Sequence, residues 1–322
     1  MIRWGILSTA RIADRILEGA RLSETARIVA VGSRDRARAQ AYAAEKGIER
    51  AHGSYEELLA DPEVDAVYIP LPNSMHVPWT ITALQAGKHV LCEKPLARDP
   101  RLVEQAFDAA AAADCVLMEA FMWRFHPQTD ELVRLVRSGA VGEVRYVHAA
   151  FAFGGIGVEN VRLQKALEGG ALMDVGCYCV SALRLLCGEP VRVSGEQVLG
   201  GDGVDIRFAG LMRFESDVVA TFDCGMDVHR HQGIQIVGSE GSIDVPQPWQ
   251  TWEGPKIVVV RGEESETLEP PGVDPYGAEL DDMAAAIAGT RSPRLGREES
   301  VGQARTIQAL YEAAEAGRAV TL

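Results

Sequence analysis

The chain has 322 residues and a formal net charge of -14 at pH 7. Its length exceeds the size at which one hydrophobic core usually stops growing, so two domains are expected. Hydrophobic residues at 47% and charged residues at 24% are typical of a globular protein and give no sign of disorder. The acidic surplus argues against nucleic acids and anionic membrane surfaces as partners, because both carry negative charge.

The sequence also predicts where the protein resides. No apolar run approaches the roughly 18 residues that a membrane span needs. The opening "MIRWGILS" enters a strand-like pattern at once, without the architecture of a signal peptide. We therefore expect a cytoplasmic protein.

Six cysteines lie mostly in apolar sequence and form no C-x-x-C pair: Cys92, Cys115, Cys177, Cys179, Cys187 and Cys224. This distribution predicts reduced core residues rather than disulfides. The pair in "GCYCV" could in principle bind a metal with some of the seven histidines, but no H-x-x-x-H or comparable spacing supports it. We expect no metal site.

The first part of the chain, residues 1–121, alternates apolar β-branched runs with helical patterns. Strands are predicted at 2–8, 26–33, 65–72, 88–95 and 116–124, and helices at 10–22, 34–47, 54–64, 76–87 and 100–116. Strands separated by helices of this length indicate βαβ units on a parallel sheet. The predicted fold class is α/β, with an N-terminal Rossmann doubly wound domain.

Beyond residue 121 the alternation of strands and helices gives way to consecutive strand patterns. A predicted helix at 129–142 leads into alternating strand patterns at 143–153, 191–200, 210–226, 231–245 and 256–262, and helical patterns return at 278–289 and 298–317. Consecutive strands of this kind indicate an α+β domain with a large open, mainly antiparallel sheet. We expect this second domain, residues 122–322, to bind substrate and to form oligomers.

The first strand-to-helix turn is "GILSTARIA". A dinucleotide site wants G-x-G-x-x-G/A here, so that the backbone approaches the pyrophosphate at the helix N-terminus. Ser8, Ala10 and Ala13 occupy those three positions, and the strict pattern therefore fails. The residues remain small, and the hydroxyls of Ser8 and Thr9 can donate to phosphate. The alternative is a plain strand-to-helix turn.

The end of the second predicted strand, "AVGSRDRAR", bears on the choice of cofactor. An NAD site has an acidic residue there for the ribose 2′-hydroxyl. This chain has Ser33 and Arg34, with Arg36 and Arg38 following. A hydroxyl and a guanidinium suit a 2′-phosphate, so NADP is favoured, with NAD as the alternative. Arg36 and Arg38 are also compatible with a solvated start of a helix.

Three strings occur together in order: "GILSTARIA", "PLPNSMH" followed by "EKP", and "GGALMDVGCYCV". Together they resemble the Gfo/Idh/MocA oxidoreductases over nearly the whole chain. The resemblance is strongest to the branch that contains dimeric dihydrodiol dehydrogenase, NADP-dependent xylose dehydrogenase and glucose-fructose oxidoreductase. The departures from the glycine fingerprint recur in that branch.

The resemblance implies roles for individual residues. Lys94 would contact substrate and cofactor ribose, the "PNSMH" loop would line the nicotinamide, and Tyr178 would transfer the proton, with Asp174 beside it. The implied catalytic residues are Lys94, Tyr178 and Asp174. The implied cofactor-binding residues are Ser8, Thr9, Ala10, Arg11, Ile12, Ser33, Arg34, Arg38, Leu71, Pro72, Asn73, His76, Glu93 and Lys94. The implied substrate-binding residues are Lys94, Trp123, Arg124, His126, Asp174 and Tyr178.

The chemistry agrees with this assignment. Oxidation of a hydroxyl needs a base for the proton while hydride leaves for the nicotinamide. A tyrosine with a reference pKa of about 10 is a poor base, and a nearby ammonium such as that of Lys94 lowers the pKa by favouring phenolate. Glu93 either orients Lys94 or neutralises it. We expect NADP(H)-dependent hydride transfer to or from a sugar or polyol.

Several alternatives stay open. Lys94 could extend from a strand end into water, Tyr178 could be a core aromatic residue, and Asp174 could cap its helix. His76 and His126 could only orient loops, and Arg124 could only pair with an acidic neighbour. The substrate could be a trans-dihydrodiol or a nucleotide-linked keto-sugar. A non-enzymatic alternative is a dinucleotide sensor. The family further implies a homodimer or higher homo-oligomer through the second sheet.

Overall fold

The computed structural model describes residues 1–322, except for the side chain of residue 253, and divides them into two compact units. The first unit contains residues 1–125 and 274–301, and the second contains 126–273 and 302–322. The sequence placed 274–301 in the second domain. They lie in the first unit because helix α8 (Pro275–Ile287) packs on α1 (Ala13–Leu22), where Gly19 meets the backbone of Gly277.

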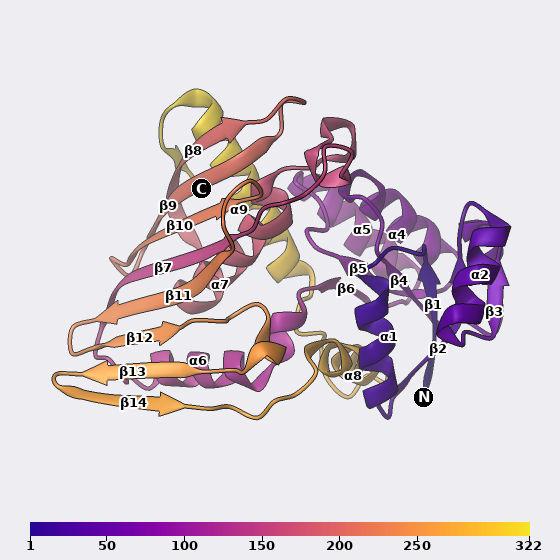
Figure 1. The fold of residues 1–322 in the computed structure, drawn as a ribbon, viewed down its shortest axis with the longest axis horizontal. Helices are drawn as coiled ribbons and strands as arrows, with labels where there is room; N and C mark the ends of the chain where they lie inside the picture. The colour runs from indigo at the N-terminus through magenta and orange to yellow at the C-terminus, as the bar shows by residue number, and fades with distance from the viewer. The chain divides into compact units, whose positions relative to one another are not determined.

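The first unit holds a six-stranded parallel sheet (Figure 1). Its strands are β1 (Ile2–Leu7), β2 (Ala26–Gly32), β3 (Arg50–His52), β4 (Ala66–Ile69), β5 (His89–Glu93) and β6 (Leu117–Ala120). Their order is β3-β2-β1-β4-β5-β6, which confirms the predicted Rossmann architecture. The strand order runs one way from β1 to β3 and the other way from β4 to β6, so it switches direction between β1 and β4. Ligands of such sheets bind at this point, outside the carboxyl ends of the strands.

Most helices of this unit begin at capping side chains. Besides α1 and α8, the helices are α2 (Arg36–Lys46), α3 (Tyr55–Leu59), α4 (His76–Gln85) and α5 (Pro100–Ala112), with short 3-10 turns η1 (Asn73–Met75) and η2 (Met122–Phe125). Asp35, Ser54 and Asp99 cap α2, α3 and α5 through their side chains, whereas α1 and α4 begin without such a cap. The strand predicted at 116–124 ends at Ala120 because η2 follows, and the short β3 was not predicted.

The second unit holds a nine-stranded sheet. Its strands are β7 (Val144–Ala152), β8 (Pro190–Leu199), β9 (Asp205–Phe214), β10 (Val219–Gly225), β11 (His231–Gly238), β12 (Ser242–Val245), β13 (Ile257–Arg261), β14 (Glu264–Leu268) and β15 (Val320–Thr321). The order is β14-β13-β12-β11-β7-β10-β9-β8-β15, and β7 and β10 are parallel while the other neighbours are antiparallel. The mainly antiparallel sheet is confirmed, and β14 and β15 were not predicted.

Helices cover one face of this sheet (Figure 1). They are α6 (Pro127–Arg137), α7 (Cys177–Cys187) and most of α9 (Arg297–Ala316), and shorter turns are η3 (Val161–Leu163), η4 (Lys165–Leu167), the π-helical turn η5 (Leu172–Gly176) and η6 (Thr251–Glu253). Phe208 of β9 packs edge-on against Tyr311 of α9, with 5.7 Å between ring centroids. Residues that alternate with this buried set, such as His148 and Thr221, point to the opposite, open face.

One segment is longer and more apolar than the sequence led us to expect. Lys165–Cys187 is long and apolar enough, by length and composition, to cross a membrane. Its most apolar stretch is 78% buried inside the protein, as in the core helix of a globular domain. The segment also combines η4, η5 and α7 rather than one regular helix.

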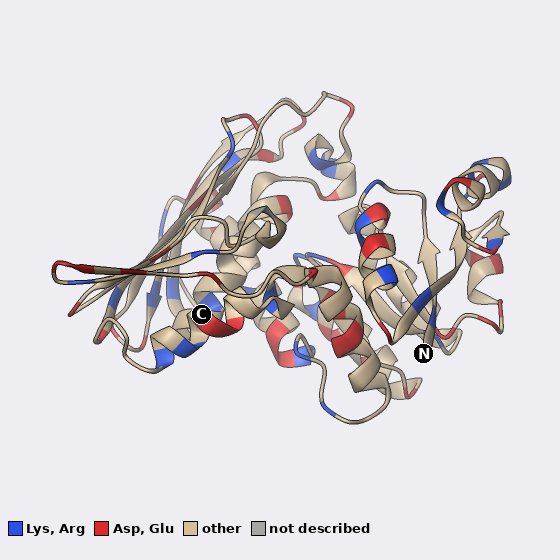
Figure 2. Ribbon diagram, turned by 60° about the horizontal axis from the view of Figure 1, so that its bottom comes forward, with Lys and Arg blue, Asp and Glu red and all other residues tan. Residues whose placement is uncertain are grey.

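Acidic and basic residues are interspersed along the ribbon of both units (Figure 2).

The six cysteines are thiols outside any disulfide, and four of them are buried. Burial raises the pKa of the Cys92 thiol and the Cys179 thiol. These thiols therefore behave as core side chains.

Candidate active site

The first-strand turn is built around Ser8, which has a φ of 148°, a backbone conformation that favours glycine. Its hydroxyl accepts a hydrogen bond from the amide of Ala10 at 3.1 Å and donates to the carbonyl of Pro70 at 3.4 Å. Ser8 thus takes the backbone shape of the first fingerprint glycine while it ties β1 to the loop after β4. Thr9 and Ala10 follow in the turn, and Arg11 and Ile12 lead into α1.

Two of the predicted arginines, Arg34 after β2 and Arg38 in α2, lie near one side chain. Burial raises the pKa of Tyr55, and the positive charges of Arg34 and Arg38 oppose that rise. Both guanidinium groups therefore lie near the Tyr55 hydroxyl. Arg36 instead bonds Glu57 at 2.6 Å. Ser33 is buried, and its hydroxyl accepts from the Asp35 amide at 3.3 Å.

His76 bridges two loops of the first unit. Its Nδ1 lies 2.9 Å from the carbonyl oxygen of Pro95, and its Nε2 lies 2.8 Å from that of Leu71. The ring is buried, and burial lowers the pKa of His76 to about 4. Both ring nitrogens face backbone carbonyl oxygens, and the neutral ring donates its single N–H to one of them. His76 therefore holds the loop that carries Pro72 and Asn73 rather than exposing a nitrogen to a ligand.

Lys94 follows directly on the last residue of β5, and a cis peptide bond joins it to Pro95. The preceding Glu93 accepts a hydrogen bond of 2.5 Å from the hydroxyl of Tyr68 in the neighbouring strand β4. The carboxylate of Glu119 accepts from the amide of Leu96 at 2.8 Å and so holds the chain after Pro95. Lys94 is half-buried at the carboxyl edge of the sheet.

Trp123 and Arg124 lie in η2, and both are buried. The Arg124 guanidinium lies over the Trp123 ring, 5.7 Å from its centroid, and pairs with Glu299 at 3.5 Å. Arg294 donates to the carbonyl of Arg124 at 2.6 Å. Arg124 therefore has an acidic partner, as one of the alternatives predicted, and its contact with substrate stays a prediction.

His126 is the N-cap of α6. Its Nδ1 accepts from the amide of Gln128 at 3.0 Å, and burial lowers the pKa of His126 to about 4. The imidazole is therefore neutral near pH 7, with its proton on Nε2. The hydrogen bond from Gln128 gives His126 a structural role, which was one of the two roles that the sequence left open.

Asp174 lies within η5 and forms an ion pair with Arg162, with 2.8 Å between Nε and Oδ2. It does not cap the helix, because that place belongs to Asp205, which accepts from the amide of Leu172 at 2.7 Å. Tyr311 also donates to Asp205 at 2.7 Å. The alternative that Asp174 caps its helix is therefore wrong.

Tyr178 lies one turn beyond Asp174, at the start of α7. Its ring packs edge-on against Phe151 and Trp249, with centroid distances of 5.3 and 5.8 Å. Trp249 is fixed in turn by its indole N–H, which donates to the carbonyl of Ala150 at 2.9 Å. Phe151 and Trp249 thus fix the orientation of the Tyr178 ring.

The structure therefore divides the predicted residues between the two units. Those of the first unit lie at or after the carboxyl ends of β1, β2, β4, β5 and β6, apart from Arg38 within α2. Those of the second unit are His126 at the start of α6, Asp174 in η5 and Tyr178 at the start of α7. The sequence missed the residues that position them: Tyr68, Glu119, Arg162, Phe151 and Trp249. No local pattern in the sequence singles out any of these five residues.

Comparison with known families decides the identity of this fold. Residues 2–121 match the model of an oxidoreductase family with an NAD-binding Rossmann fold, and residues 129–244 match the GFO/IDH/MocA C-terminal domain. The chain belongs to the Gfo/Idh/MocA oxidoreductase family. The predicted family, the enzymatic class and a nicotinamide dinucleotide as cofactor are confirmed.

Curated members of the Gfo/Idh/MocA family resemble the chain over most of its length. D-xylose 1-dehydrogenase (NADP(+)) 2 of Haloferax volcanii is 40% identical over 325 residues, which cover 99% of each protein. Trans-1,2-dihydrobenzene-1,2-diol dehydrogenase of Danio rerio is 37% identical over 85% of this chain and 81% of that protein. The chain is thus similar to dehydrogenases of two substrate classes.

Among solved structures, a 3-ketoreductase from Actinomadura kijaniata in complex with NADP and TDP-benzene superposes with a TM-score of 0.91. It is 30% identical and covers 97% of both chains. Structures of that reductase include variants in which one lysine and one tyrosine were replaced. Its nucleotide-linked ligand adds a third substrate class among the relatives.

Proposed function

We propose that the protein is an NADP(H)-dependent oxidoreductase that transfers hydride between the nicotinamide and a hydroxyl or carbonyl carbon of a sugar or polyol. The observation that carries the proposal is the placement of Lys94 at the carboxyl end of β5, where doubly wound sheets bind their ligands. The similarity to the xylose dehydrogenase over 99% of both chains supports the substrate class.

The residues present fit NADP. Ser8 holds the glycine-like turn ahead of α1, whose first amides suit a pyrophosphate. Arg34 and Arg38 converge near Tyr55 at the end of β2, where the adenosine ribose of such folds lies. Two guanidinium groups there suit a 2′-phosphate. When bound, this cofactor supplies or accepts hydride at nicotinamide C4.

The chain's own residues would manage the proton. In the oxidative direction, Tyr178 takes the proton from the substrate hydroxyl, and in the reductive direction it returns it to the carbonyl oxygen. The ammonium of Lys94 favours the phenolate, which the proposal requires near neutral pH. Asp174, held by Arg162, would accept a hydrogen bond from a second substrate hydroxyl.

Spacing along the chain supports this pair. In the 3-ketoreductase, the replaced lysine and tyrosine are separated by the same number of residues as Lys94 and Tyr178. The two chains align over 97% of their lengths. Equal spacing in chains of matching length is expected if the same two side chains serve the reaction.

The test replaces each side chain by one of similar size. Tyr178→Phe and Lys94→Met should each lower kcat by about a hundredfold or more, the low end of general acid-base contributions. Tyr146→Phe is the control, because that tyrosine lies on the open face of the second sheet. Retained turnover in both variants would refute the mechanism.

A panel of sugars, polyols, trans-dihydrodiols and nucleotide-linked keto-sugars, run with NADP and NAD in both directions, decides the substrate. The highest kcat/KM is expected with an aldose or polyol and NADP. The dihydrodiol and keto-sugar alternatives rest on the relatives that bear those names. Tight NADPH binding without turnover on any member would instead favour the dinucleotide sensor.

The remaining parts of the proposal concern organisation. We assign cofactor binding to residues 1–121, and substrate binding and oligomer formation to residues 122–322 apart from 274–301, which belong to the first unit, in a cytoplasmic protein. The open face of the nine-stranded sheet is the surface for a homo-oligomer, because exposed apolar residues such as Leu211 and Val237 lie there. Sedimentation at micromolar concentration should show at least a dimer, and a monomer would contradict this assignment.

A further inference from the structure

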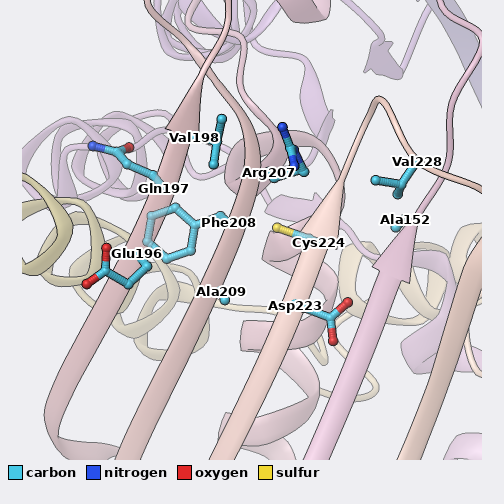
Figure 3. A pocket seen from close by; sticks show the side chains of 10 residues that line it. All are labelled: Ala152, Glu196, Gln197, Val198, Arg207, Phe208, Ala209, Asp223, Cys224 and Val228. Carbon is cyan, nitrogen blue, oxygen red and sulfur yellow. The ribbon is translucent and has the colours of Figure 1, made fainter.

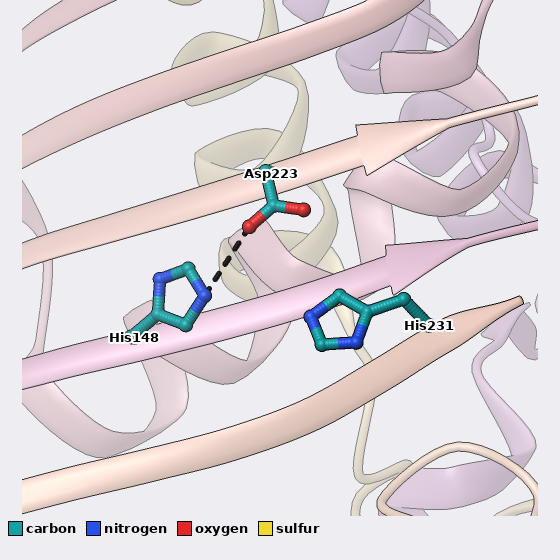
Figure 4. Close-up of side chains that lie close together, drawn as sticks. All are labelled: His148, Asp223 and His231. Carbon is teal, nitrogen blue, oxygen red and sulfur yellow. Dashed lines mark ion pairs between the residues drawn. The ribbon is translucent and has the colours of Figure 1, made fainter. Parts of the chain in front are cut away.

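Three metal-ligating side chains meet on the open face of the second sheet. They are His148 of β7, Asp223 of β10 and His231 of β11 (Figure 4). One ligand atom of each lies within 4.8 Å of those of the other two. The strands are neighbours in the order β11-β7-β10, so hydrogen bonding of the sheet fixes the backbone positions beneath all three.

The first pair is already aligned. His148 Nε2 lies 3.2 Å from Asp223 Oδ1, the dashed line in Figure 4. On the other side of the ring, His148 Nδ1 lies 3.1 Å from the Thr221 hydroxyl, which in turn lies 2.6 Å from the hydroxyl of Tyr146. The ring can donate Nε2–H to the carboxylate while Nδ1 accepts from Thr221, or it can donate Nδ1–H to Thr221 and leave the Nε2 lone pair for a cation beside Asp223. A bound metal ion requires the second arrangement.

We propose that His148, Asp223 and His231 form a binding site for Zn²⁺. Two imidazoles and one carboxylate are a ligand set that suits Zn²⁺. A partner that orients a ligating imidazole through its second nitrogen, as Thr221 does here, is the usual support of such sites. Two ligands of one Zn²⁺ lie at most about 4 Å apart, so a small rotation of the exposed His231 completes the set.

Asp223 also borders a groove. The groove, of about 330 Å³, lies on this sheet and is lined further by Ala152, Glu196, Arg207 and Val228 (Figure 3). Three protein ligands leave the fourth tetrahedral position for water or for a ligand from a second copy of the chain, whose proposed contact surface is this same face. The predicted catalytic residues lie elsewhere in the fold, so the site is separate from the proposed reaction.

No local pattern predicts this site, because its members are far apart in the chain and only strand pairing brings them together. The spacing of cysteines and histidines alone predicted no metal. The bound ion would join three adjacent strands and so stabilise the folded state by mass action.

The test uses the full-length protein without a polyhistidine tag, stripped with EDTA and titrated with Zn²⁺ by calorimetry. One ion per chain is expected, together with a rise in Tm. His148→Ala and His231→Ala should each weaken binding at least tenfold. Thr221→Val should weaken it about 10- to 100-fold, the range for loss of a partner that orients a ligand. Absorption of Co²⁺ in place of Zn²⁺ reports the ligand set directly.

His229→Ala is the matched control, since His229 is an exposed histidine two positions from His231. It should bind Zn²⁺ as the unchanged protein does. Because His231 is exposed, its variant is expected to fold, and circular dichroism verifies this. The proposal is overturned if the unchanged protein binds no Zn²⁺, or if His229→Ala loses as much affinity as His231→Ala. Neither result bears on the dehydrogenase reaction.

Discussion

The hydroxyl of Tyr68 donates a hydrogen bond of 2.5 Å to the carboxylate of Glu93, the residue immediately before Lys94. Tyr68 is completely buried, and burial together with Glu93 raises its pKa well above the ordinary value. The tyrosine therefore stays a neutral donor. The sequence left Glu93 either to orient Lys94 or to neutralise it, and this bond indicates that the carboxylate is anchored in the sheet.

Tyr68→Phe should lower the free energy of unfolding by about 1–3 kcal/mol, because it removes the hydroxyl donor from a partly buried carboxylate. Urea denaturation followed by tryptophan fluorescence measures the loss. Tyr42→Phe is the matched control, since the Tyr42 hydroxyl donates to Asp14 at 2.9 Å in a more exposed place. An equal loss in both variants would show that burial of the Tyr68 bond is unimportant.

Arg34→Ala should reduce the preference for NADP over NAD about 10- to 100-fold in kcat/KM, the equivalent of one charged hydrogen bond. Arg36→Ala should change the preference little, because Arg36 bonds Glu57 instead. Steady-state kinetics with both cofactors compare the two variants. A preference that Arg34→Ala leaves untouched would remove the basis for a 2′-phosphate site.

Ser8→Ala should be less stable than Ser8→Gly by about 1–3 kcal/mol, the usual cost of a backbone held in a sparsely populated region. Both variants lose the hydroxyl that bonds Ala10 and Pro70, but only glycine adopts a φ of 148° without strain. Parallel urea denaturation gives the difference. Equal stability of the two variants would argue against strain at this turn.

Glu279 of α8 predicts a pH dependence of stability. It is completely buried, and neither carboxylate oxygen has a hydrogen-bond partner among the residues that the structure describes. Burial, and then the charges of Glu93 and Asp282, raise its pKa well above the ordinary 4.5. The folded protein thus keeps the proton that the unfolded chain releases above that value.

The contribution of Glu279 is therefore fully present below about pH 4.5 and is lost as the pH rises toward its folded pKa. Glu279→Gln should be about as stable as the unchanged protein near pH 4 and more stable near pH 8. Thermal melts at both pH values test this. Greater stability of the unchanged protein at pH 8 would mean that Glu279 is ionised and paired.

The order of elements in the first unit could be predicted because its signals are local. Strands such as β4 and β5 are continuous apolar runs, and helices such as α2 and α5 begin at capping residues, so both follow from neighbouring residues. The short strands β3 and β15 were not predicted, because they have too few residues to show a period.

Tertiary structure decided what no local pattern contains. The 274–301 segment joins the first unit through the close approach of Gly19 and Gly277, which lie far apart in the sequence. The same holds for the partners of the site, since Tyr68 reaches Glu93 across neighbouring strands and Arg162 reaches Asp174 from a loop. The sequence by itself determined the family and predicted the side chains that we propose to carry the chemistry. Only the fold decided which partners hold them, because those contacts depend on strand pairing and packing between distant residues.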